Sequence, residues 1–222
     1  MLQIKLLFFI TFNSLRKFGL NILIVSLLAF LFYSCSDTET EVENETPFEE
    51  NELVEIPKRP GDRPETTLEV PHLQLGVELV PEVHEELIRR VYSIPGIEHY
   101  SSVLSQWKSL SLAEGTTLLR PEALIEDREF GHIHDDGSLH IFLSPSRSET
   151  AVDSCWAVHH PFSLREQEEG TQVEPGGSIK TWQGFVMLYT PQSIDELNVT
   201  FQLIIDAYNN VTGESLVATD FY

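Results

Sequence analysis

The sequence predicts an α+β domain in which helices pack on one face of a small, mainly antiparallel sheet. A tight hairpin pattern covers residues 131–145, and a continuous apolar run at 182–190 suits a central strand. Apolar residues recur at helical spacing on both sides of these strands. The predicted order is helix, helix, hairpin, helix, strand and helix. At 222 residues, the chain is long enough for one such domain with extensions.

The N-terminus has the pattern of an export signal. Three basic residues precede an apolar run at 18–33, and a serine and Cys35 follow that run at once. This resembles a bacterial lipoprotein signal peptide covering residues 1–34, with Cys35 as the lipidated first residue of the mature chain. The other hypothesis is an uncleaved signal anchor, because the run is only a little short of a membrane span.

Both hypotheses place the remaining chain outside the cytoplasm. With a lipid on Cys35, the protein is predicted in the cell envelope of a bacterium, anchored at the outer membrane or the cell surface. An acidic run after a lipidated cysteine also resembles the signal that sends some Gram-negative lipoproteins to the cell surface.

That acidic run, Asp37 to Glu55, contains nine acidic residues and no basic one. Like charges and low hydrophobicity prevent collapse, so the run should be a solvated tether. A proline-rich stretch at 57–64 extends it. We therefore predict a tether over residues 35–67 and a folded domain over residues 68–222.

The net charge excludes some partners. The whole chain carries −21, and without residues 1–34 it keeps 11 basic and 35 acidic residues, a net charge of −24. Nucleic acids and anionic membrane surfaces need a cationic face, so neither is an expected partner. The second cysteine, Cys155, has no intramolecular partner once Cys35 is lipidated, and is expected to be a buried structural thiol.

Sequence patterns typical of helix starts and stops predict several elements along the chain. Pro81 suits the first position of a helix, and a weaker helical pattern covers residues 101–110. A capping box at Ser146 predicts a short helix through Trp156. Another at Ser193 starts the best amphipathic pattern in the chain, and Gly213 follows it as a stop.

The hairpin contains three of the chain's eight histidines, and its turn decides where they point. Gly137 supplies the positive φ that the turn requires. A two-residue loop would put His132 and His134 on one face and His140 on the other. A three-residue loop closed by Gly137 pairs His132 with His140 and His134 with Ser138.

The three-residue loop is favoured because it leaves one fully apolar face for a core. That apolar face would carry Ile133, Leu139, Ile141 and Leu143. The opposite face would carry Phe130, His132, His134, Ser138, His140 and Phe142.

Three imidazoles on one face suit a transition metal. The Cβ atoms of His132 and His140 would lie ~5 Å apart, with His134 on the diagonal. Such a set forms a three-nitrogen site with positions left for water, oxygen or substrate. His160, or its neighbour His159, can approach from the following loop.

Two other roles for the cluster stay open. Without a metal, His132, His134, His140 or His160 could act as the general base of a catalytic site. Alternatively, the imidazoles only hydrogen-bond one another and the nearby backbone. Asp135 and Asp136 are placed to orient an imidazole from behind. His72, His84 and His99 are expected to be surface or packing residues, whereas Phe130, Phe142 and Trp156 are expected to line a ligand pocket or simply the core.

Taken together, these motifs resemble the luciferase-like domain family. The similarity covers the His-x-His-x-Asp-Gly-Ser-Leu-His block at 132–140, Leu-x-Pro at 143–145, a tryptophan before His160-Pro161, and the strand and helix at 186–197. The resemblance extends over roughly residues 81–213. Fungal luciferases of this family oxidise a hydroxylated pyrone with molecular oxygen. The resemblance therefore implies an oxidoreductase with oxygen as co-substrate, but it does not imply light emission.

Two functions follow as hypotheses. The first is an enzyme that oxidises a small aromatic or enolic molecule, with oxygen, a transition metal or both. The alternative is a non-catalytic envelope lipoprotein that binds a small ligand or a partner protein. Replacing His132 or His140 by alanine should abolish an activity in the first case. If these histidines are only structural, the same changes should lower the melting temperature and remove no binding.

Overall fold

The computed structural model describes residues 53–102, 107–170 and 181–222. The predicted signal peptide, Cys35 and most of the predicted tether lie outside these ranges. In chain order the elements are β1 (Glu65–Thr66), β2 (Gln74–Leu75), α2 (Pro81–Val91), β3 (Ile97–Glu98), β4 (Lys108–Leu112), η2 (Pro121–Ala123), β5 (Glu129–Ile133), β6 (Leu139–Phe142), α3 (Pro145–Asp153), β7 (Ala157–His159), α4 (Pro161–Glu169), β8 (Phe185–Leu188), α5 (Ile194–Thr212) and η3 (Ala218–Phe221).

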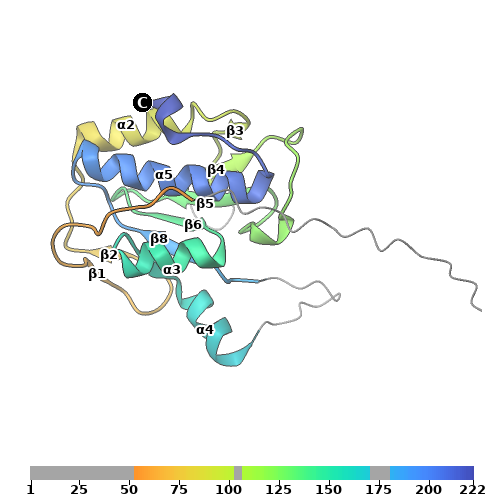
Figure 1. Cartoon of the computed structure of the whole chain (residues 1–222). Coiled ribbons are helices and arrows are strands. Elements are labelled where there is room, and N and C mark those ends of the chain that lie inside the picture. Colours follow the sequence, from red (N-terminus) through yellow and green to blue (C-terminus); the bar gives the residue numbers. More distant parts are fainter. Residues whose placement is uncertain (1–52, 103–106, 171–180) are drawn as a thin grey trace, which may run out of the picture. The chain divides into compact units, whose positions relative to one another are not determined.

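Six strands form one antiparallel sheet, in the order β3-β4-β5-β6-β8-β7. The short strands β1 and β2 pair with each other in a separate ribbon. Figure 1 shows α2, α5 and α3 lying across one face of the large sheet. The predicted α+β class, with a mainly antiparallel sheet and helices on one face, is confirmed. None of the helices in the described ranges is long and apolar enough to cross a membrane.

Helix α5 is the main helix of the core. The Ser193 hydroxyl accepts a hydrogen bond from the Glu196 amide at 3.2 Å, and Gly213 ends the helix with a left-handed φ of 78°. Both predicted ends are therefore confirmed. The neighbouring helix α3 is tied to α5 by Arg147, whose Nε donates to Asp206 Oδ2 at 2.7 Å. The apolar hairpin residues Ile133, Leu139, Ile141 and Leu143 are fully buried in the same core.

The predicted helix at 101–110 is wrong. Residues 108–112 form strand β4, which pairs with β3 and β5, while residues 103–106 lie outside the described ranges. The sequence Lys-Ser-Leu-Ser-Leu alternates with a period of two, and Leu110 and Leu112 are buried. That period fits a strand better than a helix. The helix predicted through Trp156 is also too long, since α3 ends at Asp153.

The proline-rich stretch predicted as the end of the tether packs on the domain. Ile56 is buried, and the Trp156 indole donates to the Pro57 carbonyl at 2.6 Å. The Arg59 amide bonds to Ser154 O at 2.8 Å, and its guanidinium pairs with Glu196 at 3.0 Å. The packed part of the chain thus begins upstream of residue 68, because these groups find partners at the ends of α3 and α5.

Candidate metal centre

The hairpin of β5 and β6 adopts the favoured register. His132 lies opposite His140, and the His134 amide bonds to Ser138 O at 2.8 Å. Gly137 closes the turn with a φ of 83° and donates to His134 O at 3.0 Å. The three-residue loop is therefore confirmed, and it puts the three histidine side chains together. None of them is more than 4% exposed.

A β-bulge changes which residue stands beside them. The pairing of β4 with β5 shifts from Leu110–Gly131 to Ser111–Glu129, so Phe130 is skipped. Phe130 instead contacts Tyr208 of α5, with ring centroids 6.3 Å apart. The prediction that Phe130 shares the histidine face is therefore wrong. Glu129 takes that place.

Glu129 fixes the orientation of His132. Its carboxylate oxygen Oε1 accepts from His132 Nδ1 at 2.8 Å and from the Ser102 hydroxyl at 2.7 Å. Because a carboxylate only accepts, the hydrogen of the His132 ring sits on Nδ1. In the neutral His132 ring, the lone pair is therefore on Nε2, which lies toward His140.

Ser138 fixes the orientation of His134. Its hydroxyl donates to Asp136 Oδ1 at 2.7 Å, so it can only accept from His134 Nδ1, 2.9 Å away. This leaves the lone pair of His134 on Nε2. Asp136 thus orients an imidazole as predicted, through Ser138 rather than directly.

Both lone pairs are aimed at one atom. His132 Nε2 and His134 Nε2 each lie 3.1 Å from His140 Nδ1. A hydrogen on His140 Nδ1 would have to serve two acceptors, and a lone pair there would leave three lone pairs facing one another. A metal ion would fit this arrangement, since nitrogens bonded to one tetrahedral ion lie roughly 3.4 Å apart at usual bond lengths.

Burial favours the neutral form of His134 and of His140. Desolvation, followed by the nearby His132 and His72, lowers the pKa of His134 to about 3. Desolvation, followed by the surrounding histidines, also lowers the pKa of His140 well below its usual value. Neutral imidazole is the form that ligates metals, so the lone pairs of these rings are available near pH 7.

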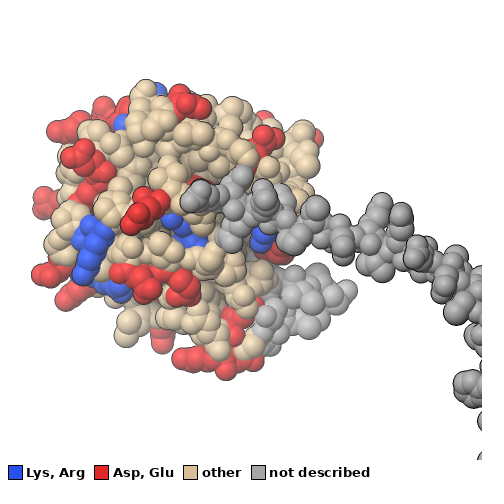
Figure 2. Space-filling view, in the orientation of Figure 1, with Lys and Arg blue, Asp and Glu red and all other residues tan. Residues whose placement is uncertain are grey.

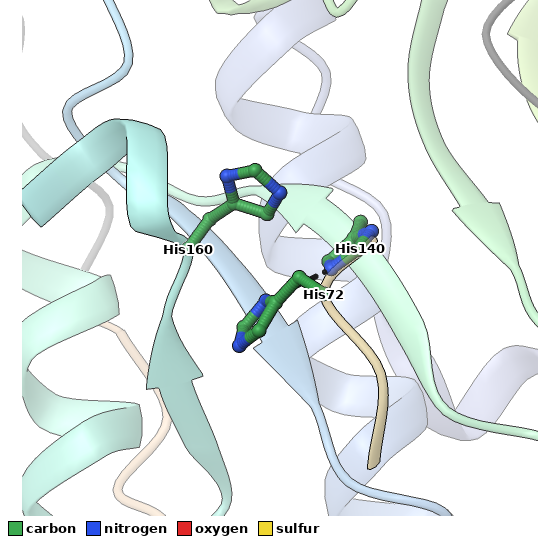
Figure 3. Close-up of side chains that lie close together, drawn as sticks. All are labelled: His72, His140 and His160. Atoms are coloured by element: carbon green, nitrogen blue, oxygen red, sulfur yellow. Dashed lines mark hydrogen bonds between the residues drawn. The ribbon is translucent and has the colours of Figure 1, made fainter. Parts of the chain in front are cut away.

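A second histidine group shares His140. Figure 3 shows His72, from the loop between β1 and β2, beside His140 of β6, with His160 between β7 and α4. Potential ligand atoms of these three side chains lie within 4.8 Å of one another, as do those of His132, His134 and His140. His72 is 3% exposed and its ring packs on that of His140, so of the two expected roles, surface or packing, the surface role is wrong.

The hydrogen bonds decide between the two groups. His160 caps α4, and its Nδ1 accepts from the Phe162 amide at 3.1 Å, which leaves the hydrogen of the neutral ring on Nε2. A neutral His140 has a single lone pair, so it cannot serve both groups. His132, His134 and His140 are therefore the candidate metal ligands, with His72 and His160 around them.

The remaining predicted site residues are more distant from this centre. Phe142 stacks on Phe185 at 4.6 Å, and Phe185 contacts the rings of His140 and His160. Trp156 packs under Arg59 rather than on a histidine. His159 lies on β7, 3.4 Å from Glu149.

Residues 127–207 match the family model of the luciferase domain. No curated protein and no solved structure matched the chain. The matched segment contains the hairpin, Glu129 and His160, but His72 lies outside it.

Replacing Glu129 by glutamine should weaken metal binding about 10- to 100-fold, the usual cost of losing an outer-shell partner. The neutral amide accepts less strongly from His132 and no longer enforces its tautomer. Competition with a chromophoric chelator measures the affinity. Glu126→Gln, at an exposed position three residues earlier, is the matched control and should bind as wild type does. Equal affinities for the two variants would contradict this role of Glu129.

Proposed function

We propose that this chain, which carries a luciferase-like domain, holds one transition-metal ion on His132, His134 and His140 and oxidises a small aromatic or enolic molecule with oxygen. The observation that carries the proposal is the convergence of two Nε2 lone pairs on His140 Nδ1 at 3.1 Å each. Each of those two lone pairs is fixed by a hydrogen bond on the far side of its ring.

The donor set supports this choice of metal and chemistry. Imidazole nitrogens suit zinc, copper, iron and nickel, and oxygen chemistry favours iron or copper among them. Three neutral imidazoles would add no negative charge to balance that of the ion. When bound, such an ion would stabilise the negative oxygen of an enolate and leave positions for oxygen. Glu129, behind His132, is an acidic side chain hydrogen-bonded to the ligand set.

The aromatic surroundings support the class of substrate. The Trp107 ring lies 4.0 Å from that of His134, and Phe185 lies 5.5 Å from His140. Flat side chains beside the histidines favour a flat ligand, which they can hold by stacking or edge contacts. A substrate with a conjugated, enolisable ring fits both this environment and the charge of the ion.

Oxygen uptake tests the proposed activity. The full chain, loaded with iron or copper, should consume oxygen with cyclic enolic or hydroxylated aromatic compounds, and His132→Ala should abolish uptake while the fold is retained. A metal-loaded protein that binds such compounds without consuming oxygen would support the alternative, a non-catalytic ligand-binding protein. Uptake that is unchanged in His132→Ala would exclude this centre as the site.

Export is part of the proposal. We propose that the protein is anchored in the cell envelope by a lipid on Cys35, as the N-terminal pattern indicates. The acidic side chains spread over the visible face in Figure 2 suit a surface that does not bind anionic membranes directly. Fatty-acid labelling of the full chain should be lost in Cys35→Ser, and labelling that persists would contradict the anchor.

A further inference from the structure

We infer that His72 is a positioning residue of the metal centre: it accepts the hydrogen of His140 Nε2 and so keeps the His140 lone pair on Nδ1. This inference rests on the proposed metal centre. It adds that the centre is completed by a segment outside the matched residues 127–207.

His140 is the one ligand whose partner comes from elsewhere in the chain. His132 is oriented by Glu129 and His134 by Ser138, both from the hairpin itself. In the described part of the chain, the hydrogen-bond partner of His140 Nε2 is His72 Nδ1, at 3.2 Å and 68 residues away. The two rings are nearly parallel, at 13°, with centroids 5.3 Å apart.

The loop that carries His72 is built to hold it inward. Its Thr67 hydroxyl donates to Pro71 O at 2.8 Å and accepts from the Leu73 amide at 2.9 Å, which closes the loop on itself. Leu68 is 88% exposed and Val70 is 52% exposed, whereas His72 is 3% exposed. Stability alone would bury the apolar residues and expose the histidine, so this inverted pattern points to a function.

The ribbon is also fastened to the hairpin. Gln74 donates through Nε2 to Thr190 Oγ1 at 2.9 Å and accepts from the Thr190 amide at 3.1 Å. The same Thr190 hydroxyl donates to Asp136 O in the hairpin turn at 2.8 Å. This chain of bonds sets the position of β2 relative to the turn, and with it the distance between His72 and His140.

Cobalt binding by the full chain tests the inference, because the d–d spectrum of Co²⁺ reports ligand geometry as well as affinity. His72→Leu removes the acceptor at similar size and should weaken Co²⁺ binding about 10- to 100-fold, with a changed spectrum. His72→Asn places Oδ1 where Nδ1 stood and should restore most of the affinity and the spectrum. His99→Leu, at an exposed histidine beside Tyr92, is the control and should behave as wild type.

Four outcomes would overturn the inference. Wild-type affinity and spectrum in His72→Leu would remove any role for His72 at the centre. Equal losses in His72→Leu and His72→Asn would leave it only a structural role. Two cobalt ions in wild type and one in His72→Leu would make His72 a ligand. No cobalt in wild type would overturn the proposed centre together with the inference. Two ions would also contradict the assignment of His140 to a single site, whereas the first two outcomes leave the proposed centre standing.

Discussion

Replacing His140 by alanine should lower transition-metal affinity by roughly 10²- to 10³-fold. Structural zinc sites with four ligands bind with about 10–16 kcal/mol, or roughly 2.5–4 kcal/mol for each ligand. His140 Nδ1 is the atom on which both other lone pairs converge, so its loss removes a ligand and leaves His132 Nε2 and His134 Nε2 without their common contact. Isothermal titration with Zn²⁺ measures the change.

Other histidine variants distinguish the ligands from the neighbouring histidines. His134→Ala should show a loss of the same order, because His134 supplies an equivalent nitrogen. His160→Ala should still bind one ion, because the Nδ1 of His160 is occupied by the Phe162 amide. His99→Ala, outside the cluster, should bind as wild type does. A loss in His160→Ala as large as that in His140→Ala would contradict the choice of ligands.

The metal-free protein should lose stability steeply below pH 6.5. Burial lowers the pKa of His72 to about 4 and those of His134 and His160 to about 3, and it lowers the pKa of His140 well below its usual value. In the unfolded chain each ring regains a pKa near 6.5, so the unfolded state binds more protons between pH 6.5 and these lower values. The stability that these neutral rings contribute is fully present above pH 6.5 and is lost as the pH falls toward 4.

Each of the four rings should lower the free energy of unfolding by about 1.4 kcal/mol for each pH unit below 6.5. This is an upper bound, for groups that stay neutral in the fold. Urea unfolding of the metal-free chain at pH 7.0, 6.0 and 5.0 measures the slope, above the range in which most carboxylates titrate. His140→Ala should show a shallower slope, since one buried ring is missing. A free energy of unfolding that stays level between pH 7.0 and 5.0 would contradict neutral, buried imidazoles.

Local signals in the sequence are sufficient to predict the hairpin and the last helix. The glycine at 137 and the apolar alternation of 139–143 select the register that pairs His132 with His140. A serine with a glutamate three residues on, and a glycine at 213, set the ends of α5. Each of these features depends on residues close together in the chain, so pattern and turn chemistry determine it.

The features of the site that could not be predicted from the sequence depend on contacts between distant segments. The bulge at Phe130 arises from the pairing of β4 with β5, and β5 alone, with strict alternation, places Phe130 rather than Glu129 beside the histidines. His72 lies in a loop without periodicity, and its partner is 68 residues away. No local pattern marks either residue. Glu129 precedes His132 by three positions, and only the bulge in β5 brings its carboxylate to the histidine face.

The most direct test of the metal centre is the metal content of the full chain, purified in detergent without a metal-binding tag and analysed by elemental mass spectrometry. The single lone pair of His140 predicts one transition-metal ion per chain, absent from His134→Ala. No metal, even after incubation with zinc, iron and copper, would contradict the centre, and two ions per chain would contradict the assignment of His140 to a single site.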